Sequence, residues 1–509
     1  MFKLPNNIYL QCLFFTMIWQ LSLLTLYLLD LIYYNPLIEW SDIISNFFFI
    51  FFITSLFSSP LFAIILLFII YIIGIVLYFF IRQNLTLAQI SNIPELISTY
   101  SPQSFIMIVL FFFFIYFLFK KSIKINFILQ KLKPRIFQIT ICFILLAMIS
   151  FGTQLYFPKI YKHNTENFNK FATWKHGGQL YSIIYHYAER KIMFTKLKNI
   201  SDKSSSMLSF VDYTPPKLMI IILLESFVPR SEMQPNNYLP FLEKHGFKST
   251  ILEAPVFAGL SAASEFEILC GIPEVQPLGD MTFNFLGGKK TDICLPSLLS
   301  DIGYKSLSIT GTKSHFHNSK NAYKSLGFDK TISRDDLSNN DFDGIHPSDL
   351  TLYNRALKEI LNNKDDKFFL YIFTAAGHSP YNLNQSKRPR LSDNRYLDRI
   401  TYSERELEAF LDKLKVLKID ASIVVAGDHA TRDSLRNRKI LAKNRNLLRV
   451  WSKSKNLENT MSNCSQYYEI AKFFTGQECH RIKTVGRGDS FHLYNEAETL
   501  ILKLIKNSQ

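Results

Sequence analysis

Long apolar runs dominate the N-terminal third of the chain. Four uncharged stretches occur before residue 158, and a helix needs about 20 apolar residues to cross a bilayer. The second stretch is nearly twice that length and is interrupted by Ser58-Ser59-Pro60, so we interpret it as two spans, with a re-entrant hairpin as the alternative for the first. Five membrane spans are therefore predicted. The uncharged stretches are 4–29, 43–81, 96–119 and 136–158.

After Lys217 the pattern changes to short apolar runs that alternate with helical patterns. Short apolar runs followed by polar residues are typical of buried parallel strands. Their alternation with helices predicts an α/β domain, in which a mostly parallel sheet is sandwiched between helices. The predicted strands are 218–224, 249–253, 306–310, 368–373 and 421–426. The predicted helices are 239–245, 262–270, 295–302, 319–326, 348–361 and 402–417.

These patterns divide the chain into three parts. Residues 1–158 are the predicted membrane domain, 159–216 a polar linker that ends in Pro215-Pro216, and 217–509 the globular domain. The loop 120–135 contains six Lys or Arg and no acidic residue, which predicts that it is cytoplasmic. Counting spans then places the N-terminus in the cytoplasm and the globular domain outside. We interpret the first span as an anchor, because no small-residue cleavage site follows it.

The cysteines agree with an external location. Four of the six lie in the globular domain, and an even number is compatible with two disulfides. Proximity in the sequence favours Cys270–Cys294 and Cys464–Cys479 among three connectivities, and unpaired buried thiols are the alternative. The net charge of +15 comes partly from the loop 120–135, and a cationic external domain beside a membrane would favour anionic lipid head groups. No motif for nucleic-acid binding is present.

Candidate metal ligands follow two of the predicted strands. Glu225 ends the first strand, and Asp428-His429 comes directly after the last. The carboxyl ends of parallel strands form the edge of the sheet where ligands bind. A carboxylate beside an imidazole suits zinc, manganese or a similar divalent ion. The alternative is that these residues cap turns or bond to the backbone.

A hydroxyl and several histidines complete the candidate site. Ser261 opens a predicted helix, and the free N–H groups at the start of a helix stabilise an oxyanion. A metal ion bound to the Ser261 hydroxyl would make this hydroxyl a nucleophile. The alternative is an ordinary helix cap. His378 follows the strand 368–373 and could bind a phosphate or protonate a leaving group. His315 and His317 are weaker candidates for the same substrate pocket.

The order of these residues resembles the lipoteichoic acid synthase and phosphoglycerol transferase branch of the alkaline phosphatase superfamily. The resemblance implies one divalent ion, manganese first with zinc or magnesium as alternatives, bound by Glu225, Ser261, Asp428 and His429. It also implies that Ser261 stands where Thr is usual and that His378 contacts the substrate phosphate. The matching segments are 224–227, 259–266, 316–327, 377–381 and 427–429.

The resemblance also implies a reaction and a location. Such enzymes split a membrane phospholipid, hold its head group covalently and pass it to an acceptor alcohol. We therefore expect a multi-pass protein of the bacterial inner membrane that moves phosphoglycerol from phosphatidylglycerol to a glycan or lipid-linked acceptor. His317 and Ser319 replace a Trp and an Arg of the glycerol-phosphate site, and the four cysteines are more similar to Gram-negative periplasmic relatives that decorate glucans.

Two alternatives remain open at this stage. Phosphoethanolamine transfer from phosphatidylethanolamine to a lipopolysaccharide or glycan uses the same residues. A non-catalytic membrane scaffold is the other, and the presence of all four ligand residues argues against it. A sulfatase is disfavoured, because Cys294-Leu-Pro-Ser-Leu298 lacks the Arg of the formylglycine pattern.

Overall fold

The computed structural model describes most of the C-terminal part of the chain. The chain divides into two compact units, Met1–Phe194 and Thr195–Gln509. Apart from six residues, the predicted spans and the loop 120–135 lie outside the described residues, and the boundaries at 158 and 216 stay predictions. Within the part of the chain that is described, no helix is both long and apolar enough to cross a membrane. Besides six N-terminal residues, the described ranges are 208–210, 214–227, 239–253, 261–274, 281–338, 341–378, 381–429, 447–454, 464–479 and 489–509.

A seven-stranded sheet forms the centre of the second unit, with strand order β2-β9-β8-β1-β7-β3-β4. Neighbours from β8 to β4 are parallel. Only β9 runs in the opposite direction, because it is antiparallel to both β2 and β8. The strands are β1 (Leu218–Leu224), β2 (Lys248–Glu253), β3 (Lys305–Thr310), β4 (Lys330–Ile332), β7 (Phe368–Phe373), β8 (Ser422–Gly427) and β9 (Leu447–Lys453).

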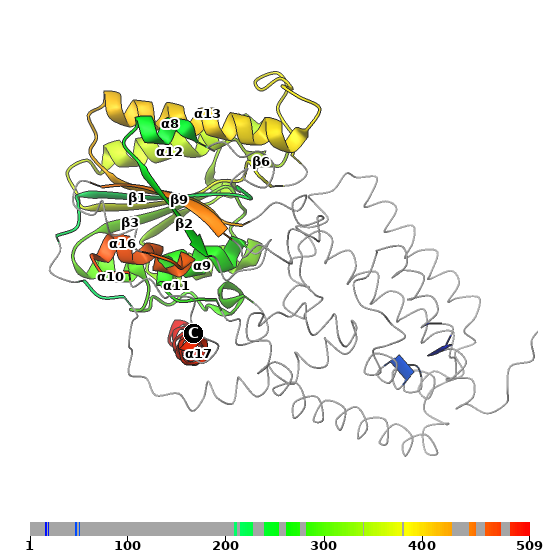
Figure 1. Ribbon diagram of the computed structural model, residues 1–509, viewed down its shortest axis with the longest axis vertical. Helices are drawn as coiled ribbons and strands as arrows, with labels where there is room; N and C mark the ends of the chain where they lie inside the picture. The colour runs from blue at the N-terminus through cyan, green and yellow to red at the C-terminus, as the bar shows by residue number, and fades with distance from the viewer. Residues whose placement is uncertain are drawn as a thin grey trace, which may run out of the picture. The chain divides into compact units, whose positions relative to one another are not determined.

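Helices cover both faces of this sheet (Figure 1). All seven residues of β1 are buried, as expected for a strand with helices on either side. Leu218, Ile220, Ile222 and Leu224 pack into one core with apolar residues of the first helical layer. That layer holds α8 (Pro240–Lys244), α12 (Asp349–Asn362) and α13 (Arg395–Val416). The opposite layer holds α9 (Ser261–Cys270), α10 (Leu295–Asp301), α11 (Ser319–Leu326) and α16 (Lys472–Thr475).

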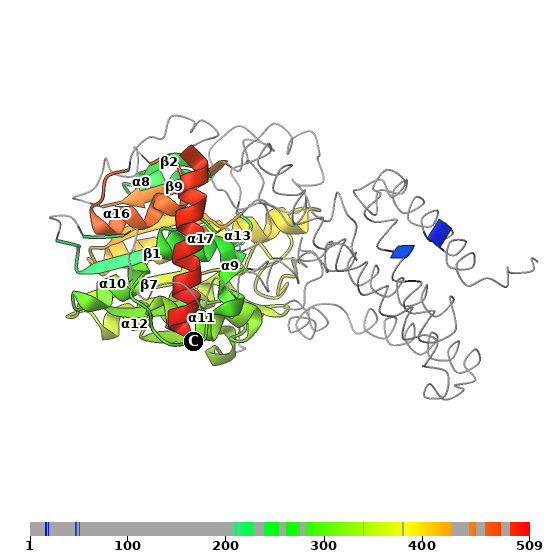
Figure 2. The ribbon, with the colours of Figure 1, turned by 90° about the horizontal axis from the view of Figure 1, so that it is seen from below.

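The last helix, α17 (Asp489–Ser508), crosses the outer side of the second layer (Figure 2). Its C-terminal end is fixed there by hydrogen bonds: Gln509 Nε2 donates to Phe285 O at 2.7 Å, and Gly287 N donates to Ser508 Oγ at 3.1 Å. The shorter elements are the antiparallel pair β5 (Phe342–Asp343) and β6 (His346–Pro347), and the 3-10 helices η3 (Thr282–Phe285), η4 (Phe316–Asn318), η5 (Arg334–Asp336) and η8 (Tyr467–Ala471).

The predicted α/β domain is confirmed, and all five predicted strands occur within one residue of their expected bounds. The prediction for α13 was too short, because this helix begins at Arg395. Asn394 caps it by accepting hydrogen bonds from Tyr396 N and Leu397 N. The strands β4 and β9 and the helices α16 and α17 were not predicted. β4 has only three residues, too few to show a period, and the other three elements follow segments that are rich in polar residues.

Candidate active site

The sheet places the residues that follow β1, β7 and β8 at one edge. β1 lies between the other two strands, with Leu223 opposite Phe373 and Leu224 opposite Gly427. Backbone hydrogen bonds continue past the strand ends: Thr374 N donates to Leu223 O at 2.9 Å, and Asp428 N donates to Leu224 O at 3.1 Å. Three chain segments that are far apart in sequence therefore end side by side.

The predicted metal ligands converge at this edge. Glu225, Asp428 and His429 are buried, and one ligand atom of each lies within 4.8 Å of the others. The hydroxyl of Ser261, the first residue of α9, lies 3.1 Å from Glu225 Oε2 and 3.1 Å from His429 Nε2. The described part of α9 begins with Ser261. Ser261 therefore lies in the first turn of the helix, where backbone N–H groups have no intrahelical acceptor.

The electrostatics of this cluster fit a bound cation. Asp428 Oδ2 is buried without a hydrogen-bond partner, 3.3 Å from His429 Nε2. Burial and the charge of Glu225 raise the pKa of Asp428 well above its usual value. Burial also acts to raise the pKa of Glu225, but His429 and then His378 outweigh it and lower that pKa. Two carboxylates, an imidazole and a hydroxyl are a donor set that zinc or manganese accepts.

Ser226 orients both carboxylates, and the sequence analysis did not single it out. Its backbone is left-handed, with φ of 52°, which costs a non-glycine residue about 1–2 kcal/mol. Its N–H donates to Asp428 Oδ1 at 2.6 Å and its hydroxyl donates to Glu225 Oε1 at 2.7 Å. Tyr396 OH donates to its carbonyl at 2.8 Å. These bonds offset the strain and fix the turn after β1.

Two glycines allow the flanking loops to approach that turn. A Cβ atom on Gly377 would lie 1.8 Å from Glu225 O, and one on Gly427 would lie 1.9 Å from Phe227 O. Real Cβ atoms essentially never come within 3.0 Å of another heavy atom. Any other residue at either position would therefore push the loops away from β1 and separate the ligands.

The helix α9 is fixed to the site through Ser264 and Glu265. Ser264 Oγ donates to Asp428 O at 2.7 Å, so this serine supports the backbone of a ligand residue. The buried carboxyl of Glu265 accepts hydrogen bonds from Tyr323 OH of α11 and, at 2.9 Å, from Tyr371 OH of β7. Burial raises the pKa of Glu265 to about 8, although both tyrosines act to lower it. These bonds join the helix that carries Ser261 to the sheet.

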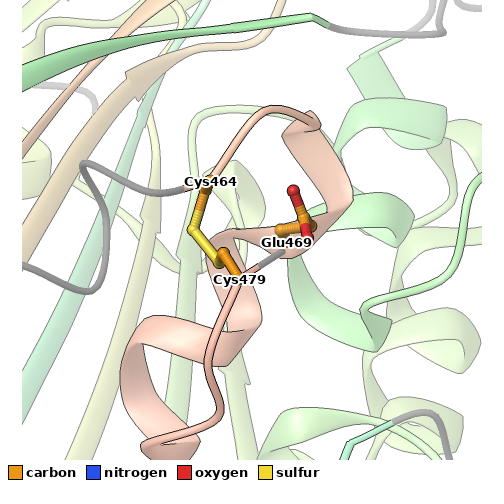
Figure 3. A group of neighbouring side chains, drawn as sticks. All are labelled: Cys464, Glu469 and Cys479. Atoms are coloured by element: carbon orange, nitrogen blue, oxygen red, sulfur yellow. A yellow bond between two sulfur atoms is a disulfide. The ribbon is translucent and has the colours of Figure 1, made fainter. Parts of the chain in front are cut away.

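Both predicted disulfides are confirmed. Cys270 pairs with Cys294 and Cys464 with Cys479, with Cα separations of 4.0 and 4.7 Å. Figure 3 shows the second pair beside Glu469, a group that also has the composition of a metal site. The sulfur atoms of Cys464 and Cys479 form the disulfide bond, so they are not available as thiolate ligands.

The segment closed by the second disulfide reaches the candidate site. Its residue Tyr467 donates a hydrogen bond of 2.5 Å to Gly427 O, directly before Asp428. No sequence pattern links Tyr467 to the site. Only the pairing of Cys464 with Cys479 indicates that this segment is held in a defined place.

The predicted substrate histidines lie in two different loops. His378 follows β7 and is close enough to Glu225 to affect its pKa. His315 is exposed and His317 partly exposed, and the ring of His317 lies 4.1 Å from the ring of Phe316. Ser319 is buried, and its hydroxyl donates to the carbonyls of residues 313 and 314. A role of these histidines in substrate binding stays a prediction.

Comparisons with known proteins agree with this architecture. Residues 217–447 match the family model described as Sulfatase. A Rhizobium meliloti protein named for cyclic beta-1,2-glucan modification is 26% identical over 235 residues, which are 42% of this chain and 35% of that protein. Lipoteichoic acid synthase 1 of Bacillus subtilis is 25% identical over 226 residues, 40% of this chain and 34% of that protein. The chain thus spans about a third of the length of these two relatives.

Among solved structures, lipoteichoic acid synthase LtaP from Listeria monocytogenes is similar with a TM-score of 0.44 and 21% identity. The similarity covers 58% of this chain and 79% of that chain. The match of the family model includes β1, α9 and β8, and the four converging side chains lie at the ends of these elements. The part of the chain at residues 217–447 is therefore similar to the Sulfatase family, and it has an α/β fold with a mostly parallel sheet.

Proposed function

We propose that this protein is a membrane-anchored phosphotransferase that moves phosphoglycerol from phosphatidylglycerol to a glycan or lipid-linked acceptor. The observation that carries the proposal is the position of Ser261. Its hydroxyl lies 3.1 Å from both a buried carboxylate and a buried imidazole, at the start of a helix whose N–H groups favour negative charge. A serine in these surroundings suits nucleophilic attack on phosphorus.

Five side chains have roles in this proposal. Glu225, Asp428 and His429 would hold a divalent cation together with the Ser261 hydroxyl. When bound, the cation lowers the pKa of the hydroxyl and neutralises charge that develops on the phosphoryl oxygens. His378 binds the phosphoryl group and delivers a proton to the leaving oxygen.

The reaction then proceeds in two half-reactions. In the first, Ser261 Oγ forms a bond to phosphorus while the bond from phosphorus to the diacylglycerol oxygen breaks. The hydroxyl proton of the serine is balanced by the proton that diacylglycerol gains. In the second, an acceptor hydroxyl attacks phosphorus in line and Ser261 leaves as its alcohol. Each half-reaction conserves atoms and charge without a further reactant.

The test is covalent capture of the head group. The full chain in detergent is incubated with phosphatidylglycerol or phosphatidylethanolamine, each labelled in its head group, and tryptic peptides are analysed by mass spectrometry. We expect phosphoglycerol on Ser261, and Ser261→Ala should abolish both adduct and turnover. Ser261→Thr should retain part of each, because it keeps a hydroxyl.

The matched control is Ser264→Ala, which removes a neighbouring hydroxyl from the same helix. This variant should still form the adduct, since Ser264 donates to the Asp428 carbonyl and does not face phosphorus. An adduct on Ser264, or turnover by Ser261→Ala, would refute the mechanism. If Ser261 takes label only from phosphatidylethanolamine, the transferred group is phosphoethanolamine and not phosphoglycerol. No adduct with either lipid would favour the non-catalytic scaffold.

A further inference from the structure

The peptide unit that precedes Asp428 is held at both of its polar ends. The N–H of Asp428 donates to Leu224 O of β1 at 3.1 Å. The carbonyl of Gly427, in the same peptide unit, accepts a hydrogen bond of 2.5 Å from the buried Tyr467 OH. Because a peptide unit is planar, its N–H and its C=O turn together. The two hydrogen bonds therefore fix the direction in which the chain enters Asp428.

Three elements of the fold hold the backbone around Asp428. β1 accepts its N–H, and α9 provides the Ser264 hydroxyl, which donates to its carbonyl at 2.7 Å. The third element is η8, which begins at Tyr467 and reaches Gly427 across 40 positions of the sequence. β1 and α9 also adjoin or carry candidate ligands, whereas η8 provides none of them. The contact from η8 can therefore act on a bound cation only by positioning Asp428.

Metal binding is sensitive to a small movement of this carboxylate. Asp428 Oδ1 accepts the N–H of Ser226 at 2.6 Å and the N–H of His429 at 2.7 Å. This leaves Oδ2, which lies 3.3 Å from His429 Nε2, to face a cation. Distances from a metal ion to its ligands stay within about 0.2 Å of their ideal values. A turn of the 427–428 peptide unit that moves Oδ2 by more than this would weaken the binding of the ion.

Tyr467 is in turn fixed by its own segment. Glu469 is buried, and its Oε2 accepts the N–H groups of residues 465 and 466, both at 3.0 Å. These bonds fix the turn from which η8 begins. The disulfide between Cys464 and Cys479 closes the segment beside Glu469 (Figure 3). Opening this closure would free the chain three residues before Tyr467, and the hydroxyl would lose its fixed position.

We propose that Tyr467 is a positioning residue for the metal ligand Asp428, and that the disulfide Cys464–Cys479 sets the metal affinity of the site through Tyr467; this rests on the metal site of the proposed function. Tyr467 donates to the backbone and not to a ligand atom, so it acts through Asp428. Removing a group that orients a metal ligand typically weakens metal binding roughly 10- to 100-fold. The disulfide then has a role in metal binding beside its contribution to stability.

The test measures the affinity of the full chain for Mn²⁺ alone. The chain in detergent is freed of metal with a chelator, and Mn²⁺ is titrated in while electron paramagnetic resonance records the free and the bound ion. We expect Tyr467→Phe to weaken Mn²⁺ binding about tenfold and to alter the spectrum of the bound ion, since the coordination geometry changes. Replacing Cys464 and Cys479 by serine should also weaken binding. In the Tyr467→Phe background the same replacement should have no further effect, because both changes act through one hydroxyl.

A matched control is Tyr304→Phe, which removes another buried tyrosine hydroxyl that donates to backbone carbonyls. Tyr304 OH donates to Pro215 O at 3.0 Å and to Pro216 O at 2.8 Å. Tyr304 directly precedes β3 and therefore lies at the edge of the sheet opposite to the site. The control should bind Mn²⁺ with the affinity and the spectrum of the wild type.

Each outcome of this experiment has a definite meaning. If Tyr304→Phe weakens Mn²⁺ binding as much as Tyr467→Phe, the effect is a general loss of stability and the inference is wrong. Unchanged Mn²⁺ affinity in Tyr467→Phe would also overturn it, although the proposed function stands. If the cysteine replacement weakens binding further in the Tyr467→Phe background, the disulfide does not act through Tyr467. A wild-type chain that binds no Mn²⁺ would overturn both the inference and the manganese site of the proposed function.

Discussion

The substitution Gly427→Ala tests how closely the loop after β8 must approach β1. The added Cβ would lie 1.9 Å from Phe227 O, whereas ordinary contact begins at 3.4 Å, so a gap of about 1.5 Å must open. The next residue is Asp428, whose Oδ1 accepts the N–H of Ser226 at 2.6 Å. A displacement of about 1 Å at a catalytic group costs roughly 100-fold in rate. We therefore expect kcat/KM to fall at least about 100-fold.

The same substitution should also lower stability, because overpacking costs about 1–3 kcal/mol. Release of labelled head group from phosphatidylglycerol measures kcat/KM, and urea unfolding of the full chain measures the free energy. The control is Gly303→Ala, with φ of 87° and no heavy atom within 4 Å of the added Cβ. It should lose about 1–2 kcal/mol through backbone strain and keep its activity.

This comparison separates loss of stability from loss of site geometry. If Gly427→Ala keeps kcat/KM within about threefold of the wild type, the close approach of the two loops is not what aligns Glu225 with Asp428. The explanation of the site from backbone packing would then be wrong.

Two further predictions concern the supports of the site. Replacing Cys464 and Cys479 together by serine should lower the free energy of unfolding by about 3 kcal/mol, because the disulfide closes a loop with a sequence separation of 15. Urea unfolding measures this free energy, and a loss below about 1 kcal/mol would contradict the prediction. Glu265→Gln should make stability less dependent on pH. The pKa of Glu265 is raised from 4.5 to about 8, so between these values the unfolded chain loses its proton first and wild-type stability falls as pH rises. Thermal unfolding from pH 5 to pH 9 measures this, and parallel curves for the two proteins would refute it.

The sequence by itself determined the class of the domain and the identity of its candidate ligands. The runs of apolar residues at 218–224, 368–373 and 421–426 are long enough for strands and too short for helices. Because Glu225, His378 and Asp428 each follow such a run, their common edge could be predicted from the pattern alone. The disulfide pairs could be predicted because the paired cysteines are close in sequence.

The supports of the site could not be predicted in this way. Ser226, Glu265 and Tyr467 have no distinctive local pattern, since their roles depend on contacts with residues 40 or more positions away. His346 lies in a two-residue strand, and the contact of its ring with that of His378 depends on how distant segments pack. The antiparallel direction of β9 likewise depends on its pairing with β2 and β8.

The physical reason is the range of the interactions involved. Strand and helix periodicity arises from neighbours in the chain, so it can be recognised in the sequence. The order of strands in the sheet, the approach of Gly377 to the turn after β1, and the pairing of His346 with His378 arise from packing between distant segments. The sequence alone therefore determined which residues could perform the chemistry, and only the tertiary structure decided which residues hold them in place.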